Sequence, residues 1–168
     1  STLCIFSADF VFSADLDRSF NSASVYGGVG LIQNPSARFD QDGEFGFGTS
    51  TEVPFKRLYA KMQFFPWLET VVRYTEGEHR RYSDGSIQSW KDKGMDIKLK
   101  LLEESDILPQ IALGFTDFGG TGAFSSEFLV ANKRINNIDY TLGIGWGRLA
   151  GTEHFTNPAA WVSESSEL

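Results

Sequence analysis

Apolar and polar side chains alternate with a period of two residues along much of this chain. The pattern is clearest after Gly94, where Met95, Ile97, Leu99 and Leu101 are interleaved with Asp96, Lys98 and Lys100. A strand places these two sets on opposite faces, whereas a helix would spread the apolar set around its circumference. We therefore predict a strand from Gly94 and a returning strand from Pro109, joined by the turn-like Glu103 to Asp106.

The same alternation predicts strands on both sides of this hairpin. Arg57 to Phe65 and Leu68 to Tyr74 are separated only by Pro66-Trp67, which is typical of a tight turn. The last strand places Ile138, Tyr140, Leu142, Ile144 and Trp146 on one face, with Asp139, Thr141 and glycines on the other. Weaker runs lie at Val25 to Ile32, Gly43 to Ser50 and Ser126 to Arg134. Together they predict an all-β, antiparallel meander of about eight strands.

Three regions follow from this pattern. Residues 1–24 are expected to be a signal remnant or an amino-terminal segment, and Cys4 within them to be an inert apolar residue. Residues 25–150 are expected to form a barrel-like domain, and residues 151–168 a polar loop or truncated end. Within the domain, the polar stretch from Glu76 to Lys93 predicts a long exposed loop, and the DFGGTG at Asp117 to Gly122 predicts a loop with positive φ angles.

Composition narrows the function classes. A formal charge of -7 argues against an electrostatic nucleic-acid binder, so no nucleic-acid partner is expected. A single cysteine excludes an internal disulfide, and two histidines far apart in the sequence make a metal site unexpected. We expect no cofactor. No run of about 18 apolar residues is present, which excludes a helical membrane span.

Alternation alone leaves two interpretations of the apolar face. In a soluble sandwich it forms the core, whereas in a membrane barrel it faces lipid and the polar face lines a lumen. Runs of about nine residues, alternately short and long connections, and aromatic residues at strand ends favour the barrel. These aromatic residues are Phe64, Phe65, Trp67, Tyr74, Phe115 and Trp146.

In the barrel interpretation, eleven polar side chains form a wall on the lumen side. They are Lys61, Gln63, Glu69, Arg73, Asp96, Lys98, Lys100, Gln110, Thr116, Asp139 and Thr141. A wall of mixed charge suits a hydroxyl-rich polymer, and the inward glycines suit a wide, hydrated lumen. The alternative is a structural ladder in which Lys98 and Arg73 pair with acidic neighbours and neutralise the interior.

No catalytic constellation is evident, and we expect the chain not to be an enzyme. Asp92 with Asp96, or Glu103 with Glu104, could in principle form the acid and base of a glycosidase. Sequence proximity does not supply the required geometry across a sugar ring, and we interpret all four as solvated charge at turns and strand ends.

Several long blocks, in order from Tyr26 to Asn157, carry a family resemblance. They include YGGVGLIQNPSARFDQDGEFGFG, FFPWLETVVRYTE, WKDKG, FGGTG and IDYTLGIGWGRL. On these blocks the chain resembles the YjbH-like family of exopolysaccharide-associated outer-membrane proteins of Gram-negative bacteria. Because members of that family are several times longer, the resemblance implies an amino-terminal fragment.

The resemblance implies an outer-membrane β-barrel encoded with capsule or exopolysaccharide genes. It further implies a role in polysaccharide export or surface assembly. The expected partners are the lipid bilayer of the outer membrane, exopolysaccharide and other polysaccharide-export proteins. Two alternatives stay open: a soluble, calycin-like ligand carrier, and a polysaccharide-modifying enzyme.

Overall fold

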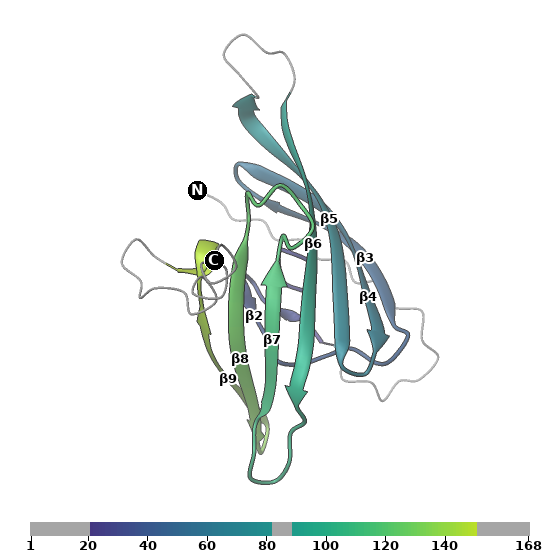
Figure 1. Cartoon of the computed structure of the whole chain (residues 1–168), viewed down its shortest axis with the longest axis vertical. Helices are drawn as coiled ribbons and strands as arrows, with labels where there is room; N and C mark the ends of the chain where they lie inside the picture. Colours follow the sequence, from purple (N-terminus) through teal and green to yellow (C-terminus); the bar gives the residue numbers. More distant parts are fainter. Residues whose placement is uncertain (1–20, 82–88, 151–168) are drawn as a thin grey trace, which may run out of the picture.

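The computed structural model describes residues 21–81 and 89–150. Its main feature is one seven-stranded sheet in which each strand pairs antiparallel with the next along the chain (Figure 1). The strands are β3 (Phe45–Glu52), β4 (Phe55–Phe65), β5 (Leu68–Arg81), β6 (Ser89–Leu102), β7 (Gln110–Thr116), β8 (Ser126–Ile135) and β9 (Ile138–Gly145). The prediction of an all-β, antiparallel meander is confirmed, and hairpins occur at Pro66-Trp67 and between β6 and β7.

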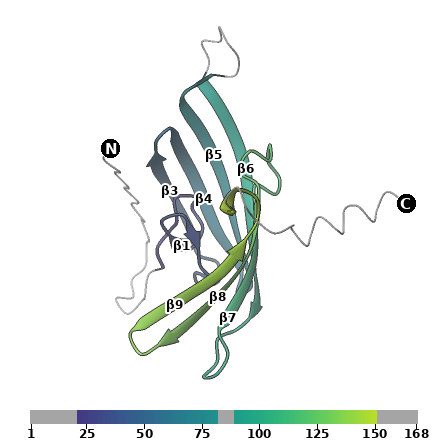
Figure 2. The same ribbon diagram turned by 90° about the vertical axis from the view of Figure 1, so that its left-hand side faces the viewer.

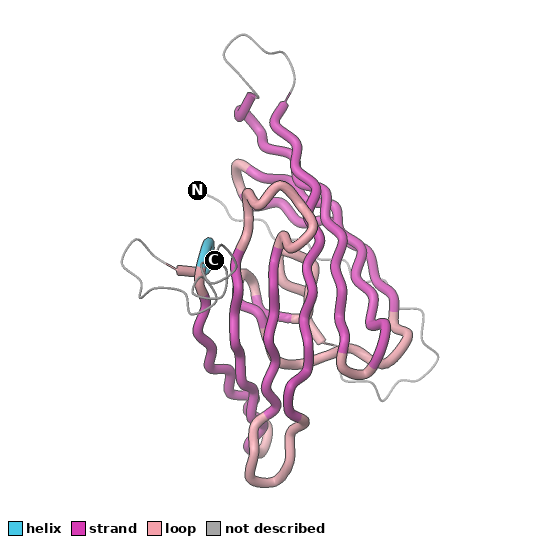
Figure 3. The backbone as a smooth tube through the Cα atoms, in the orientation of Figure 1, coloured by secondary structure: helices cyan, strands magenta, loops and turns pink. Residues whose placement is uncertain are grey.

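The sheet curves into a half-barrel, and residues 21–44 lie in its concavity (Figure 2). We call residues 21–44 the inserted segment. It contains two very short paired strands, β1 (Gly30–Leu31) and β2 (Asn34–Pro35), and otherwise consists of turns and extended chain. The helical content of the described residues is one 3-10 turn, η1 (Gly147–Leu149), drawn in cyan in Figure 3. No helix in these ranges is long and apolar enough to cross a membrane.

The two faces of the sheet have opposite polarity, and the polar face is the buried one. On the concave face Arg73 and Lys98 are 1% and 3% exposed. On the convex face Val72 and Leu142 are 60% and 80% exposed. This arrangement is the reverse of a soluble sheet, in which the apolar face packs on the core.

The apolar residues of the convex face form a band with a polar boundary and an aromatic boundary. On β6 the band runs from Met95 to Leu101, about 20 Å along the strand. At one end of the sheet, β4, β5 and β6 carry the charged cross-strand row Lys56, Glu76 and Lys91. At the other end, the β4–β5 hairpin exposes Phe64, Phe65 and Trp67.

The predicted long loop from Glu76 to Lys93 is wrong, because β5 and β6 extend well into it. β5 continues to Arg81 and β6 begins at Ser89 rather than at Gly94. Glu76 lies opposite Lys91, and Glu78 pairs with Lys56. The polar composition of this stretch indicated a loop, but cross-strand charge pairs stabilise it as the ends of two strands.

The predicted strand from Val25 to Ile32 is also wrong. Only Gly30 and Leu31 in this run belong to a strand, and Gly27 and Ile32 have positive φ angles of 99° and 54°. These turns lead the run across the concave face instead of along a neighbouring strand. The hydrated lumen expected there is accordingly filled by the inserted segment in the part of the barrel that the structure describes.

Trp146 departs from the predicted apolar face of the last strand. Ile138, Tyr140, Leu142 and Ile144 are exposed on β9, as predicted, but this strand ends at Gly145. Gly147 then turns the chain with a φ of 66°, and Trp146 is buried at 9% exposure. It is therefore not part of the exposed aromatic boundary.

The loop prediction for Asp117 to Gly122 is confirmed, because Asp117 and Gly122 have φ angles of 57° and 79°. Residues 1–20 and 151–168, and so the predictions for Cys4 and for the two chain ends, lie outside the described residues. The limits of the barrel-like domain, 25–150, stay a prediction.

A small apolar core lies between the inserted segment and the middle of the sheet. Ala37 of the segment packs with Ala112, Phe128 and Val130 of β7 and β8. Gly114 lies directly opposite Phe128, and a Cβ atom there would come within 2.0 Å of the Phe128 ring. The end of the ring can occupy this position only because residue 114 lacks a side chain.

We predict that Gly114→Ala lowers the free energy of unfolding of the full-length protein by about 1–3 kcal/mol, because the added methyl group overpacks this core. Gly119→Ala is the control, since its Cβ would meet only Met95, with the flexible end of that side chain at 3.2 Å and its Cβ at an ordinary 3.7 Å. Denaturant titration of both variants, followed by tryptophan fluorescence, measures the difference. Equal stability of the two variants would contradict this view of the core.

Candidate functional site

All eleven residues of the predicted polar wall lie on the concave face of the sheet. The alternation places them there along β4, β5, β6, β7 and β9. A shift of each strand by one residue would have turned all of these side chains to the convex face. The structure shows that these side chains share one face. That they line a passage stays a prediction.

Four of the seven charged members of the wall pair with one another across adjacent strands. Glu69 and Lys98 are direct neighbours of β5 and β6, with Nζ 3.1 Å from Oε1. Arg73 makes two hydrogen bonds to Asp96, of 2.5 and 3.1 Å. The interpretation of Lys98 and Arg73 as members of a neutralising ladder is confirmed.

Lys98 also holds the inserted segment against the sheet. Its ammonium group has three donors, and besides Glu69 it contacts the backbone oxygens of Arg38, at 2.8 Å, and Val29, at 3.4 Å. Its Nζ atom lies 4.6 Å from the centre of the Phe39 ring. One buried cation therefore joins two strands and two separate parts of the segment.

Other wall residues bind the backbone of the segment as well. The carboxylate of Glu69 accepts a hydrogen bond from the Val29 amide at 3.3 Å, and Arg73 donates to the Tyr26 carbonyl at 3.3 Å. Asn132 of β8, which shares the concave face but is not one of the eleven wall residues, accepts a hydrogen bond from the Ala37 amide at 2.8 Å. Side chains of the sheet thus satisfy backbone groups that would otherwise be buried without partners.

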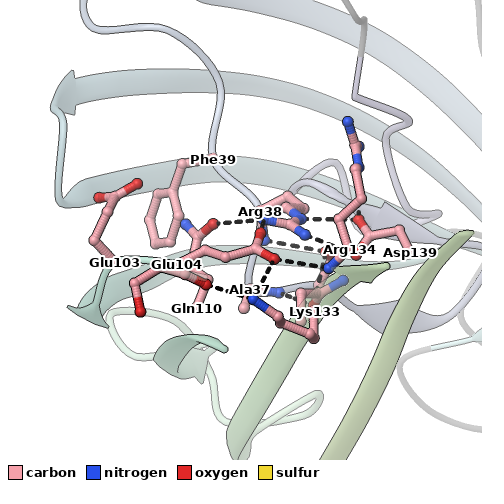
Figure 4. A network of polar contacts seen from close by, with 12 residues as sticks. Ala37, Arg38, Phe39, Glu103, Glu104, Gln110, Lys133, Arg134 and Asp139 are labelled. Atoms are coloured by element: carbon pink, nitrogen blue, oxygen red, sulfur yellow. Dashed lines mark hydrogen bonds and ion pairs between the residues drawn. The ribbon is translucent and has the colours of Figure 1, made fainter. Parts of the chain in front are cut away.

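Arg38 of the segment is the centre of a polar network at one end of the sheet (Figure 4). Its guanidinium makes two hydrogen bonds of 2.8 Å to Asp139. It donates two more, to Glu104 at 2.5 Å and to Gln110 at 3.0 Å. We call these four residues the Arg38 cluster. Arginine suits this position because its planar fork presents several donors in fixed directions.

The network shifts the pKa values of its members toward the charged forms. Hydrogen bonds to Asp139 and Glu104 raise the pKa of Arg38, against the opposing effect of burial. A hydrogen bond from the backbone amide of Arg134, followed by one from Arg38, lowers the pKa of Glu104. An open cleft of about 330 Å³ adjoins the cluster, and its lining includes Lys100, Glu103 and Arg134.

Tyr26 anchors the other end of the segment. Its ring lies between three guanidinium groups, with centroid distances of 4.7 Å to Arg57, 5.2 Å to Arg73 and 3.9 Å to Arg148. Burial raises the pKa of its hydroxyl group, and the positive charges of Arg148 and Arg57 oppose the rise. Cation-π contacts of this kind are stronger when they are desolvated.

The side chains of seven of the eleven wall residues contact the inserted segment. They are Lys61, Glu69, Arg73, Lys98, Lys100, Gln110 and Asp139. The other four make contacts within the sheet or to its loops: Gln63 with Phe65, Asp96 with Arg73 and Asp117, Thr116 with Ser126, and Thr141 with Asn132. The wall is therefore mainly a binding surface for the segment in this structure.

Comparison with known proteins gives the family. The model of the YjbH family, described as exopolysaccharide biosynthesis protein YbjH, matches residues 22–167. The chain belongs to the YjbH family. The predicted family resemblance is thereby confirmed.

A curated relative agrees with this assignment. The uncharacterized lipoprotein YjbH of Escherichia coli (strain K12) is 44% identical over 147 residues. The alignment covers 85% of this chain and 21% of that protein, so the chain spans about a fifth of its length. No solved structure matches the chain.

Some site residues of this YjbH-family chain were missed by the sequence interpretation. Arg57 and Asn132 share the concave face, and the same alternation could have found both: Arg57 precedes Tyr59 and Lys61, and Asn132 follows Phe128 and Val130. Arg38 had no such signal, because it lies outside the strands and reaches its partners through tertiary structure alone.

The structure corrects the interpretation of two carboxylates as solvated turn charge. Asp92 and Asp96 lie inside β6 and are buried, where Thr121 donates to Asp92 and Arg73 to Asp96. Glu103 does lie in an exposed turn, paired with Lys100. Within residues 21–81 and 89–150, the acidic, histidine and cysteine side chains form no group that could hold a metal ion.

We predict that Lys98→Met lowers the free energy of unfolding of the full-length protein by about 3–5 kcal/mol, because it leaves Glu69 buried without its cation. Lys56→Met is the matched control. Lys56 also pairs with a glutamate but is 57% exposed, so water screens the pair and the loss of Lys56 is expected to change stability little. Denaturant unfolding in detergent micelles measures both, and a similar cost for the two variants would be evidence against the buried pair.

Proposed function

We propose that this chain forms part of an outer-membrane β-barrel that assists secretion or surface assembly of exopolysaccharide in a Gram-negative bacterium. The observation that carries the proposal is the inverted polarity of the sheet. Charged side chains such as Arg73 are buried on the concave face, while Val72 and Leu142 are exposed on the convex face. Lipid is the solvent in which such a convex face is stable.

The limits of the apolar band support a membrane setting. A lipid-facing band of a barrel is about 25 Å tall and is flanked by aromatic residues at the interfaces. Here Phe65 and Trp67 stack at one edge of the band with ring centroids 5.4 Å apart. The charged row with Lys56 and Glu76 at the other edge would lie among the lipid headgroups.

The free edges of the half-barrel support a larger barrel. Within the described residues, β3 pairs only with β4 and β9 only with β8, so each leaves one row of backbone groups without strand partners. Such groups cannot face hydrocarbon, because every polar backbone group there needs a partner. In our proposal, further strands of a longer polypeptide, such as the relative of which this chain spans 21%, complete the barrel.

The link to polysaccharide rests on the family description and on the chemistry of the wall. Amides such as Gln110 and charged groups such as Lys100 can hydrogen-bond to sugar hydroxyl groups, and mixed charge avoids strong retention of a moving chain. The relative's name, a lipoprotein of E. coli, supports a location in the Gram-negative cell envelope. We propose that the chain acts without catalysis of its own.

A substitution on each side of the proposed interface tests the proposal against a soluble carrier. Leu142, in the band, and Ile107, in the β6–β7 connection, are 80% and 88% exposed. A soluble protein would tolerate Arg at both positions. We predict that Leu142→Arg reduces the folded protein in the outer membrane, since a cation facing the bilayer midplane costs about 2–4 kcal/mol, and that Ile107→Arg does not.

The measurement is complementation of a deletion strain with each full-length variant, with folded barrel and surface polysaccharide followed together. The proposal expects Ile107→Arg to restore both and Leu142→Arg to restore neither fully. Equal assembly of the two variants would favour the soluble alternative. Unchanged surface polysaccharide in the deletion strain itself would contradict the export role.

A further inference from the structure

The inserted segment occupies the surface on which a polymer inside the barrel would have to bind. Its contacts extend along the concave face from Tyr26, beside Arg57 and Arg73, to Arg38, beside Gln110 and Asp139. A polymer cannot use these groups while the segment holds them. Either the segment stays and the wall is purely structural, or the segment moves.

The contacts of the segment are of a kind that sugar hydroxyl groups could replace. Glu69 and Asn132 accept hydrogen bonds from backbone amides, and Lys98 donates to backbone carbonyls. A hydroxyl group both donates and accepts, so a saccharide chain could satisfy the same wall groups in turn. On release of the segment, either water or a saccharide chain has to take the place of these backbone partners.

The segment is also attached in a way that permits release. Its regular structure is limited to the two-residue strands β1 and β2, which pair with each other and not with the sheet. It joins β3 through Gly43 and Glu44, whose backbone groups are hydrogen-bonded to Gln63 of β4. The part of the segment that could leave the sheet therefore lies before Gly43, whose φ is 76°. A residue of this kind can absorb a change of backbone direction.

The charge of the wall indicates the class of polymer. Among the strand residues of the concave face, six cations lie close to five anions: Arg57, Lys61, Arg73, Lys98, Lys100 and Arg134, with Glu52, Glu69, Asp92, Asp96 and Asp139. Such a nearly balanced surface favours an uncharged, hydroxyl-rich chain over a strongly acidic one. The cleft beside Arg38, with Lys100 and Gln110 in its lining, offers an open place where such a chain could begin to displace the segment.

We propose that residues 21–44 are a resident plug, which a neutral saccharide chain displaces from the concave face during export. This inference rests on the proposed function. The plug would keep the barrel closed in the absence of polymer, and the wall would exchange one set of hydrogen-bonding partners for another.

A disulfide between plug and wall tests the inference in the full-length protein. A Cβ at Gly28 would lie 3.6 Å from Cγ2 of Val71 on β5, a position that the Sγ atom of a cysteine at residue 71 could occupy, and 2.9 Å from Oε1 of Glu69, which would have to shift. Because a disulfide needs its two Cβ atoms about 3.5–4.5 Å apart, its formation is verified by thiol titration before the assay. The variant is Gly28→Cys with Val71→Cys, with all other cysteines replaced by serine. The matched control links β8 to β9 through Val130→Cys and Gly143→Cys, since a Cβ at Gly143 would be 3.4 Å from that of Val130.

Surface polysaccharide is measured in a deletion strain that carries each variant, before and after reduction with dithiothreitol. We expect the oxidised plug-to-wall variant to lose export and to regain it on reduction, while the strand-to-strand control exports in both states. Export by the oxidised plug-to-wall variant at the control level would overturn the plug and leave the proposed function intact. Failure of the wild-type protein to restore polysaccharide would overturn the proposed function and the plug with it.

A second variant covers the case in which the disulfide prevents assembly. Arg38→Gln removes the anchor to Asp139 and Glu104, and we expect it to raise permeability of the outer membrane to a large antibiotic such as vancomycin. If the Arg38→Gln barrel folds and the outer membrane is no more permeable to vancomycin than with the wild-type protein, the plug proposal is overturned.

The ligand class is tested by alkylation of Val29→Cys in the purified full-length protein. A neutral glucan oligosaccharide should speed alkylation more than an oligogalacturonate of the same length. The opposite order would overturn the assignment of a neutral chain.

Discussion

The structure depends on the burial of charged side chains on the concave face of one sheet. A charge removed from water is stable only if it is paired and hydrogen-bonded. Lys98 shows how this requirement organises the molecule: its pairing with Glu69 aligns β5 with β6, and its contacts to the Arg38 and Val29 carbonyls hold the inserted segment. The register of the strands and the position of residues 21–44 are consequences of one electrostatic requirement.

The convex face follows from the same arrangement. Because side chains alternate along a strand, a sheet that places Arg73 and Lys98 inside must place Val72 and Leu99 outside. Seven strands with this alternation produce a continuous apolar exterior and a polar interior. The inserted segment is then the material that fills the interior of the half-barrel, through polar contacts more than through apolar packing. Only a small cluster around Ala37 and Phe128 resembles the core of a soluble domain.

The sequence predicted most of the sheet but little of its interior contents. Strict alternation from Met95 to Leu101 and from Ile138 to Ile144 was sufficient to assign strands and faces, because a period of two residues is a local property. The ends of β5 and β6 were missed because the charged residues there, such as Glu76 and Lys91, are stable in strands only through cross-strand pairing. The pattern from Val25 to Ile32 predicts a strand, whereas this run belongs to the inserted segment. Its true course depends on Glu69, Asn132 and other partners about 40 to 100 residues away in the sequence, and no local pattern reports such contacts.

The claim that lipid covers the convex face is tested most directly by spin labels placed singly from Asp139 to Ile144 in the full-length protein, reconstituted in bilayers. The account predicts that accessibility to oxygen, which concentrates in lipid, is high at Tyr140, Leu142 and Ile144. It predicts low oxygen accessibility at Asp139, Thr141 and Gly143, which face the interior of the barrel. Uniform accessibility along β9, or oxygen maxima at Asp139 and Thr141, would contradict it.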